Sequence, residues 1–494
     1  MNTADPARAE RTFDDRLNPI LVKEVRQALR GRYFRWLFGL TLLVTAFLAL
    51  MVVTIASNQS SHVRIGQEFF LSIYACMSGA VLVLVPFSAF LSTSAEWDEN
   101  THDLLVLSNL RPRHIVWGKL SSALIQALLY FSTFTPFLVA AFLLNGLDLL
   151  VALVVLACSI ASSIALSLIA IALASLARLR AARGVVLALF GAGLTAGWGM
   201  AFALVVELVQ NPQDLRSAEG QVAVVTYITT ALLLGGLAAV IAMARFSHEE
   251  ENRSTPMRVL SLTLPVVAAL WASWFHKLGS ASEFAWALQL AAAHPLLLMW
   301  IFFVSEPEAL GRRTLQFAGR RRGLALALLP VLPGGGRGVL LFACHALLAF
   351  AAVAGLNLLW STPADEQLEA FAIIGWLYLF CFVYLALPSG LVSLFGKADR
   401  LRILLRVLLV VAWPLLLFVP VMLRAFMGQF SSLDWEHPFS PYWALMRLQS
   451  SGADPYSLAG PFAVLVLLAL LTLFVNLPRM LRAVREVLSA RAQS

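Results

Sequence analysis

The residues best placed to do chemistry or to hold a partner lie in one polar stretch, EWDENTHDLLVLSNLRPRHIVWGK, at residues 96–119. It carries four acidic side chains, Glu96, Asp98, Glu99 and Asp103, followed by a small basic cluster. Apolar segments long enough to cross a bilayer stand on both sides of it. A polar segment between two such apolar segments predicts a binding surface next to the membrane.

Catalytic motifs are absent from the sequence. There is neither a G-x-x-x-x-G-K-[ST] loop nor a G-x-S-x-G elbow. His294 and His345 have no second His, Cys or carboxylate three or four residues away, so we expect helix-packing hydrogen bonds from them, not metal ligation. We therefore expect no enzyme activity and no cofactor or metal bound by this chain itself.

The composition belongs to an integral membrane protein. Of the 494 residues, 60% are hydrophobic and only 13% are charged, and the mean hydropathy is +0.80. A water-soluble domain could not cover so apolar a chain with a polar surface. The net charge of +8 is distributed over loops instead of gathered in one domain, so we expect a lipid bilayer and no nucleic acid as its partner.

Hydropathy predicts an all-α protein with twelve membrane-spanning helices. A span needs roughly 20 apolar residues. The predicted spans are 36–56, 69–93, 115–143, 149–176, 184–208, 222–244, 259–276, 284–304, 338–360, 368–395, 402–423 and 459–477.

The distribution of Lys and Arg predicts the orientation. Only five of the 36 lie in the alternate loops, namely Arg64, Arg216, Lys277, Arg424 and Arg447. Because basic loops stay inside, both termini are expected in the cytoplasm. The Arg-rich composition favours a bacterial source, and hence the bacterial inner membrane.

The segment that follows Asp98 has the punctuation of a short helix. Asn100 or Thr101 can accept backbone N–H groups as N-cap, and Asp103 faces the positive end of the helix dipole. Pro112 then enforces a break before the next span. We expect a helix over 98–110 with exposed leucines on the cytoplasmic side, which suits either a docking surface or a plain connector.

The same stretch resembles the hallmark of ABC-2 type transporter permeases, E-x-E-x-G-T-L-E-x-L followed by leucines, a basic turn and I-x-x-G-K. The matching positions are Glu96, Asp98, Thr101, Asp103, Leu105, Leu110, Arg111, Ile115, Gly118 and Lys119. Asn100 stands where the family has Gly, and His102 stands where it has Leu. Asn tolerates a left-handed turn, so the first departure is mild.

The resemblance implies the transmembrane subunit of an ABC exporter, with ATP bound and hydrolysed by a separate ATP-binding subunit. A coupling helix between spans 2 and 3 would contact that subunit. The implied partner-binding residues are Glu96, Asp98, Glu99, Thr101, Asp103, Leu104, Leu105, Leu107, Leu110 and Arg111. Sparse charge inside the spans favours a hydrophobic or amphiphilic cargo.

The N-terminal stretch NPILVKEVRQALRGRYFRWL is similar to the interface helix of that family. Leu17, Leu21, Val25 and Ala28 form an apolar stripe. Lys23, Glu24, Arg26 and Arg30 supply the polar side, which would lie on headgroups or on a partner.

The predicted organisation has two halves of six spans. It comprises a cytoplasmic segment 1–35 with the amphipathic helix, a permease unit 36–245, a linker 246–258, a second and divergent unit 259–478, and a basic tail 479–494. The resemblance is specific over 14–145. Loop 305–337 occupies the topological place of a second coupling segment, and whether a second permease or a second copy completes the transporter stays open.

Two other functions compete with this interpretation. GKADRLR, at 396–402, partly resembles the G-x-x-x-D-R-x-G-R turn of major-facilitator transporters, but it falls between spans 10 and 11 and lacks the second Gly. A membrane-embedded enzyme could assemble a site from distant helices, although no motif indicates one.

Overall fold

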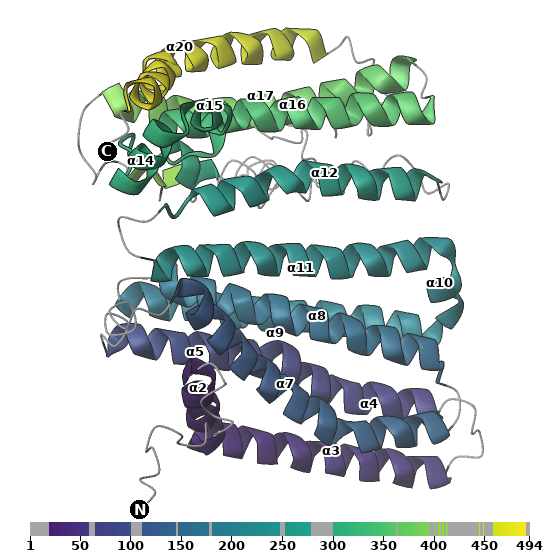
Figure 1. Cartoon of the computed structure of the whole chain (residues 1–494). Helices are drawn as coiled ribbons and strands as arrows, with labels where there is room; N and C mark the ends of the chain where they lie inside the picture. The colour runs from purple at the N-terminus through teal and green to yellow at the C-terminus, as the bar shows by residue number, and fades with distance from the viewer. Residues whose placement is uncertain are drawn as a thin grey trace, which may run out of the picture. The chain divides into compact units, whose positions relative to one another are not determined.

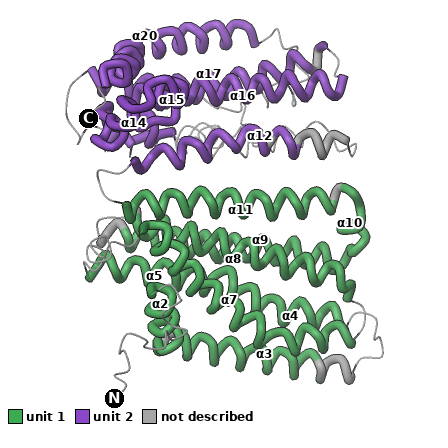
Figure 2. The backbone as a smooth tube through the Cα atoms, in the orientation of Figure 1, with its two compact units in different colours: residues 1–249 green, residues 250–494 purple. Residues whose placement is uncertain are grey.

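The computed structural model describes residues 19–58, 65–99, 111–144, 147–176, 180–247, 252–277, 300–361, 364–394 and 458–490, with isolated residues between 401 and 448. Within these residues all regular structure is helical. The chain divides into two compact units, unit 1 at Met1–Glu249 and unit 2 at Glu250–Ser494 (Figure 2). The division falls inside the 246–258 segment.

Unit 1 is a bundle of long helices, and the short helix α2 runs across their direction (Figure 1). Its elements are α2 (Pro19–Arg30), α3 (Arg32–Asn58), α4 (Ile65–Gly79), the π-helix η1 (Ala80–Leu84), α5 (Val85–Asp98), α7 (Pro112–Leu143), α8 (Leu149–Leu176), α9 (Arg180–Gln210), α10 (Pro212–Arg216) and α11 (Ala218–Phe246).

Unit 2 combines long helices with a compact group of short ones that precede α16. Its elements are α12 (Thr255–Lys277), α14 (Arg312–Arg320), α15 (Arg322–Ala327), the 3-10 helix η2 (Leu329–Val331), α16 (Gly335–Trp360), α17 (Ala364–Leu394) and α20 (Ala459–Ser489).

Nine helices of the described residues are long and apolar enough to cross a membrane. They correspond to nine of the twelve predicted spans, and the chain is a multi-span helical membrane protein. The predicted span at 259–276 coincides with α12. The apolar part of α12, Thr255–Trp271, is shorter than those of the nine helices. The predicted spans at 284–304 and 402–423 lie mostly outside the described residues.

Helix α8 is central to unit 1 because one of its faces is made of small side chains. It packs against α5, α7, α9 and α11. Ala161 and Ala165, one turn apart, are buried on it. A Cβ atom added at Gly235 of α11 would lie 3.1 Å from the Ala165 Cα atom, so the two backbones approach closely. Small residues at helix contacts are the usual basis of packing in lipid.

The start of α16 in unit 2 is packed even more tightly. Gly334 has φ of +132°, which L side chains rarely adopt. A Cβ atom at Gly336 would lie 2.7 Å from the Arg479 carbonyl oxygen, and one at Gly338 would lie 2.5 Å from the Phe303 carbonyl oxygen. The Gly-rich run therefore serves backbone packing, consistent with the absence of a phosphate-loop motif.

We predict that Gly338→Ala destabilises the protein by about 1–3 kcal/mol, because the new methyl group overlaps the Phe303 carbonyl. Gly355→Ala, in the same helix, is the matched control because nothing lies within 4 Å of its added Cβ. Thermal unfolding of the purified protein should show a lower midpoint for Gly338→Ala only. Equal midpoints for the two variants would contradict the packing described here.

Candidate partner-docking site

The last turn of α5 attaches to four other helices through three consecutive side chains. Glu96, Trp97 and Asp98 point in different directions because successive residues of an α-helix are about 100° apart. Each one contacts different neighbours. This end of α5 directly precedes residues 100–110, which lie outside the described residues.

Glu96 belongs to a buried ion cluster that joins α2, α5 and α7. The Lys119 Nζ atom of α7 lies 2.8 Å from Glu24 Oε1 on α2 and 2.9 Å from Glu96 Oε2 on α5. Lys23 Nζ, also on α2, lies 3.3 Å from Glu96 Oε1. The Lys119 side chain is 1% exposed and each of the two carboxylates 7%, whereas that of Lys23 is 50% exposed.

This cluster balances its charge, with two carboxylates facing two ammonium groups. Taking an unpaired charge out of water costs several kcal/mol, so each buried member depends on the others. Lys119 is the shared partner of Glu24 and Glu96. The positions of α2, α5 and α7 are consequently linked through one side chain.

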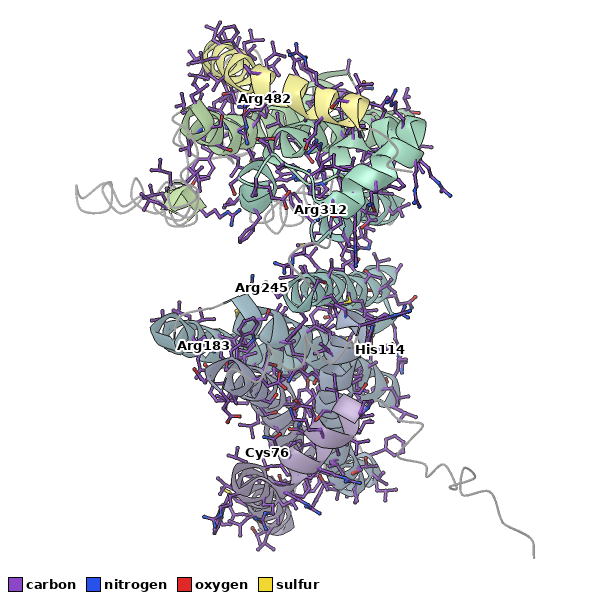
Figure 3. All side chains as sticks on the ribbon, turned by 60° about the vertical axis from the view of Figure 1, so that its left-hand side comes forward. Cys76, His114, Arg183, Arg245, Arg312 and Arg482 are labelled. Carbon is purple, nitrogen blue, oxygen red and sulfur yellow. The ribbon has the colours of Figure 1, made fainter. Side chains whose placement is uncertain are left out.

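Asp98 and Trp97 attach α5 to α9 and α11. The Arg183 guanidinium of α9 lies 2.6 Å from Asp98 Oδ1 and also donates to the Ser94 carbonyl at 3.3 Å. The Arg245 guanidinium of α11 lies 5.8 Å from the centroid of a Trp97 ring, a cation–π distance. Figure 3 labels both arginines.

Helix α2 meets the bundle with its acidic residue inward and its basic residues outward. Ile20 and Glu24 are buried, and Lys23, Arg26 and Arg30 are exposed. The apolar stripe expected from the sequence is only half-buried at Leu21, Val25 and Ala28. Helix α2 crosses the direction of the long helices (Figure 1), and its basic residues lie on its exposed side.

The predicted partner-binding residues divide into three groups. Glu96 is buried and paired inside the chain, and Asp98 is one-third exposed and bound to Arg183, so these carboxylates position α5 in this structure. Glu99 and Arg111 are exposed at the two ends of the segment. The others lie outside the described residues: Thr101, Asp103, Leu104, Leu105, Leu107 and Leu110.

The predicted start of the coupling helix also differs from the observed helix boundary. Glu96 and Asp98 lie in α5, which continues to Asp98. Residue 98 therefore belongs to α5, and the rest of the predicted helix, from residue 100 to residue 110, lies outside the described residues. Glu96 and Asp98 find buried cations on other helices, which allows α5 to extend beyond the predicted end of its span at residue 93.

Unit 2 contains a second ion cluster that the sequence analysis missed. Three buried arginines pair with three carboxylates: Arg258 with Glu306 at 2.6 Å, Arg337 with Glu486 at 2.7 Å, and Arg479 with Glu308 at 2.7 Å. A signal for it was present in the sequence, because Glu306-Pro307-Glu308 repeats the spacing of Glu96-Trp97-Asp98.

The carboxylates of this second cluster also hold the start of α16. The Gly334 N–H donates to Glu306 Oε2 at 2.9 Å, and the Gly336 N–H donates to Glu308 Oε2 at 3.0 Å. Acidic groups at a helix N-terminus satisfy its free N–H groups and interact favourably with its dipole. The pair at 306 and 308 thus joins the buried arginines to α16.

Other candidates from the sequence have structural surroundings or fall outside the described residues. His345 donates through Nε2 to the Ser261 carbonyl at 2.8 Å and packs edge-on against Trp300, as expected of a helix-packing residue. Arg320, Arg321 and Arg322 are exposed. His294 and nearly all of the GKADRLR segment lie outside the described residues.

No protein-family model matches this chain, and neither the curated proteins nor the solved structures include a significant match to it.

We predict that Lys119→Met lowers the free energy of unfolding by about 3–5 kcal/mol, because Glu24 and Glu96 lose their shared buried partner. Lys23→Met should cost much less, because Lys23 is half exposed. Adding Glu24→Gln and Glu96→Gln to Lys119→Met should restore most of the stability. Thermal unfolding in detergent measures all three, and wild-type stability of Lys119→Met would refute the role given to Lys119.

Proposed function

We propose that this chain is the transmembrane permease of an ABC-2 type exporter and that a separate cytoplasmic subunit binds and hydrolyses ATP. Residues 100–110 would contact that subunit. The cargo would be hydrophobic or amphiphilic. Both termini and the polar segment at 96–119 would lie in the cytoplasm.

One observation carries this proposal: the turn before residues 100–110 is bound to four helices at once. Glu96 contacts α2 and α7, Trp97 contacts α11, and Asp98 contacts α9. A plain connector has no need of such anchoring. A segment that receives force from a partner must pass it to the spans, and rigid, ion-paired attachment suits that task.

The arrangement of α2 supports the same function. An interface helix must lie along the membrane surface, and α2 crosses the direction of the long helices with Lys23, Arg26 and Arg30 exposed (Figure 1). Its exposed cations could face anionic headgroups or an acidic partner. Because Glu24 pairs with Lys119, a shift of α2 would also act on α7.

Each of the two units has an acidic-x-acidic pair that is held by buried cations. This repetition favours a chain built from two permease-like halves. We propose twelve spans, six in each half. The major-facilitator alternative rests on 396–402 alone, and no described contact favours it or a membrane-embedded enzyme.

The proposed orientation predicts that reporter fusions after Asn145 and after Ser494 lie on opposite sides of the membrane. Asn145 follows the third span, whereas Ser494 follows the twelfth. A phosphatase that is active only outside and a fluorescent protein that folds only inside give complementary signals. If both fusions gave the same signal, the span count would be wrong.

The docking role predicts that Leu104→Asp with Leu105→Asp abolishes transport while insertion in the membrane stays normal. Burying two leucines on a partner contributes roughly 1.5–3 kcal/mol each, and two new carboxylates would oppose contact. Leu104→Met with Leu105→Met is the matched control, because it keeps apolar side chains of similar volume.

The measurement is co-purification with the proposed ATP-binding subunit, together with the stimulation of its ATPase activity. The Asp variant should lose both and the Met variant should keep both. The purified chain alone should not hydrolyse ATP. If the Asp variant retained its partner and its transport, the proposed function would be refuted.

A further inference from the structure

Unit 1 contains an elongated groove between α9 and α11, with α8 and η1 as its floor. Two cavities of about 320 and 280 Å³ make up the groove. Both are lined by Leu82, Ser162, Ala201 and Tyr227, so they adjoin. The lining of α9 runs from Gly193 to Leu208, which is about 22 Å at 1.5 Å per residue.

The groove opens at the side of the helix bundle. Leu204 of α9 and Tyr227 of α11 both line it and are 64% and 43% exposed. Because α9 and α11 are candidate spans, this opening lies where lipid would surround the protein. A ligand could therefore enter from the bilayer.

Hydroxyl groups and aromatic rings interrupt the apolar lining where the two cavities adjoin, at Ser162 and Tyr227, and beside it. The Tyr74 and Ser159 hydroxyls lie 2.9 Å apart, and those of Ser162 and Tyr227 lie 2.6 Å apart. Trp198 lines the second cavity and donates to the Ser78 hydroxyl. Aromatic faces of this kind attract cations.

The part of the floor formed by η1 departs from regular α-helix. Pro86 has no N–H to donate to the Leu82 carbonyl four residues earlier, and the chain forms a π-helix at Ala80–Leu84. The Ser163 hydroxyl donates to the Val81 carbonyl at 3.1 Å and so satisfies a backbone group of the widened turn. π-helical turns in α-helices occur frequently at functional sites.

The charged residues that line the groove among the described residues are acidic. Glu207 and Asp214 border the larger cavity, and neither cavity is lined by a Lys, Arg or His. The nearby Arg216 pairs with Asp148. The end of the groove beyond Tyr227 is therefore negative, and its remaining length is apolar.

From this charge pattern we infer that the groove binds a single-chain amphiphile with a cationic head, such as a long-chain alkylammonium. The hydrocarbon chain lies along α8 between α9 and α11, and the head group faces Glu207 and Asp214. An anionic head would be repelled there. This site belongs to unit 1 alone and does not rest on the proposed ATP-binding partner.

The test uses tritiated hexadecyltrimethylammonium, below its solubilising concentration, and the full chain in phosphatidylcholine nanodiscs with empty nanodiscs as blank. We expect saturable binding at one site per chain. Glu207→Gln with Asp214→Asn should weaken it about tenfold, because two attractive charges are lost. Glu68→Gln removes an exposed carboxylate of α4 that does not line the groove, and it should bind as the wild type does.

Two further measurements separate the cation from the hydrocarbon. Tritiated hexadecanol should bind about tenfold more weakly than the cation and should not respond to the double carboxylate variant. Ala201→Phe fills both cavities and should remove saturable binding of both probes. If thermal unfolding shows that Ala201→Phe does not fold, the inference is tested by the carboxylate variants alone.

Three results would overturn the inference: no saturable binding by the wild type, equal binding of the two probes, or unchanged cation binding by Glu207→Gln with Asp214→Asn. Equal binding of the probes would assign the groove to lipid acyl chains. None of these results depends on whether residues 100–110 bind a partner.

Discussion

The structure of unit 1 depends on the burial of Lys119 between Glu24 and Glu96. An ammonium group out of water needs nearby carboxylates, and the carboxylates in turn need the ammonium. Because the three residues come from α7, α2 and α5, this one requirement joins a surface helix to two spans. It also orients the last turn of α5, from which Trp97 and Asp98 then contact α11 and α9.

Unit 2 meets a similar requirement with different side chains. Its cations are arginines, whose fixed fork can bind a carboxylate and backbone carbonyls together. Arg479 contacts Glu308, Asn476 and the Val304 carbonyl at once. The glycines at the start of α16 give these bulky groups the room they need. The close backbone approach and the buried ion cluster are therefore parts of one arrangement.

Helix α9 connects the two regions of unit 1 to which we assign roles. Near its beginning Arg183 binds Asp98 beside the proposed docking segment, and near its end Glu207 borders the groove. A rigid displacement of α9 would consequently change both regions together. The apolar groove and the ion-paired turn are thus joined by a continuous element, which is a physical requirement for coupling between distant sites.

Much of the architecture follows from local properties of the sequence. Runs of apolar residues determine where membrane helices form, because a span needs only length and hydrophobicity. Nine predicted spans agree with long apolar helices of the described residues. The 3.6-residue period of α2 indicates an amphipathic helix, but it places Glu24 on the polar side, whereas this residue is buried. The Glu-x-Glu spacing at 306–308 was readable too.

Only the tertiary structure decided which charges face inward. Glu96 and Glu99 are equally acidic in the sequence, yet one is buried on Lys119 and the other is exposed. The partner Glu24 is 95 residues from Lys119 along the chain, and no local pattern specifies a pairing at that separation. The groove likewise forms from residues of α8, α9 and α11 that are far apart in the sequence. Burial and pairing depend on all neighbouring helices at once, and this is why the sequence predicts the elements but not their contacts.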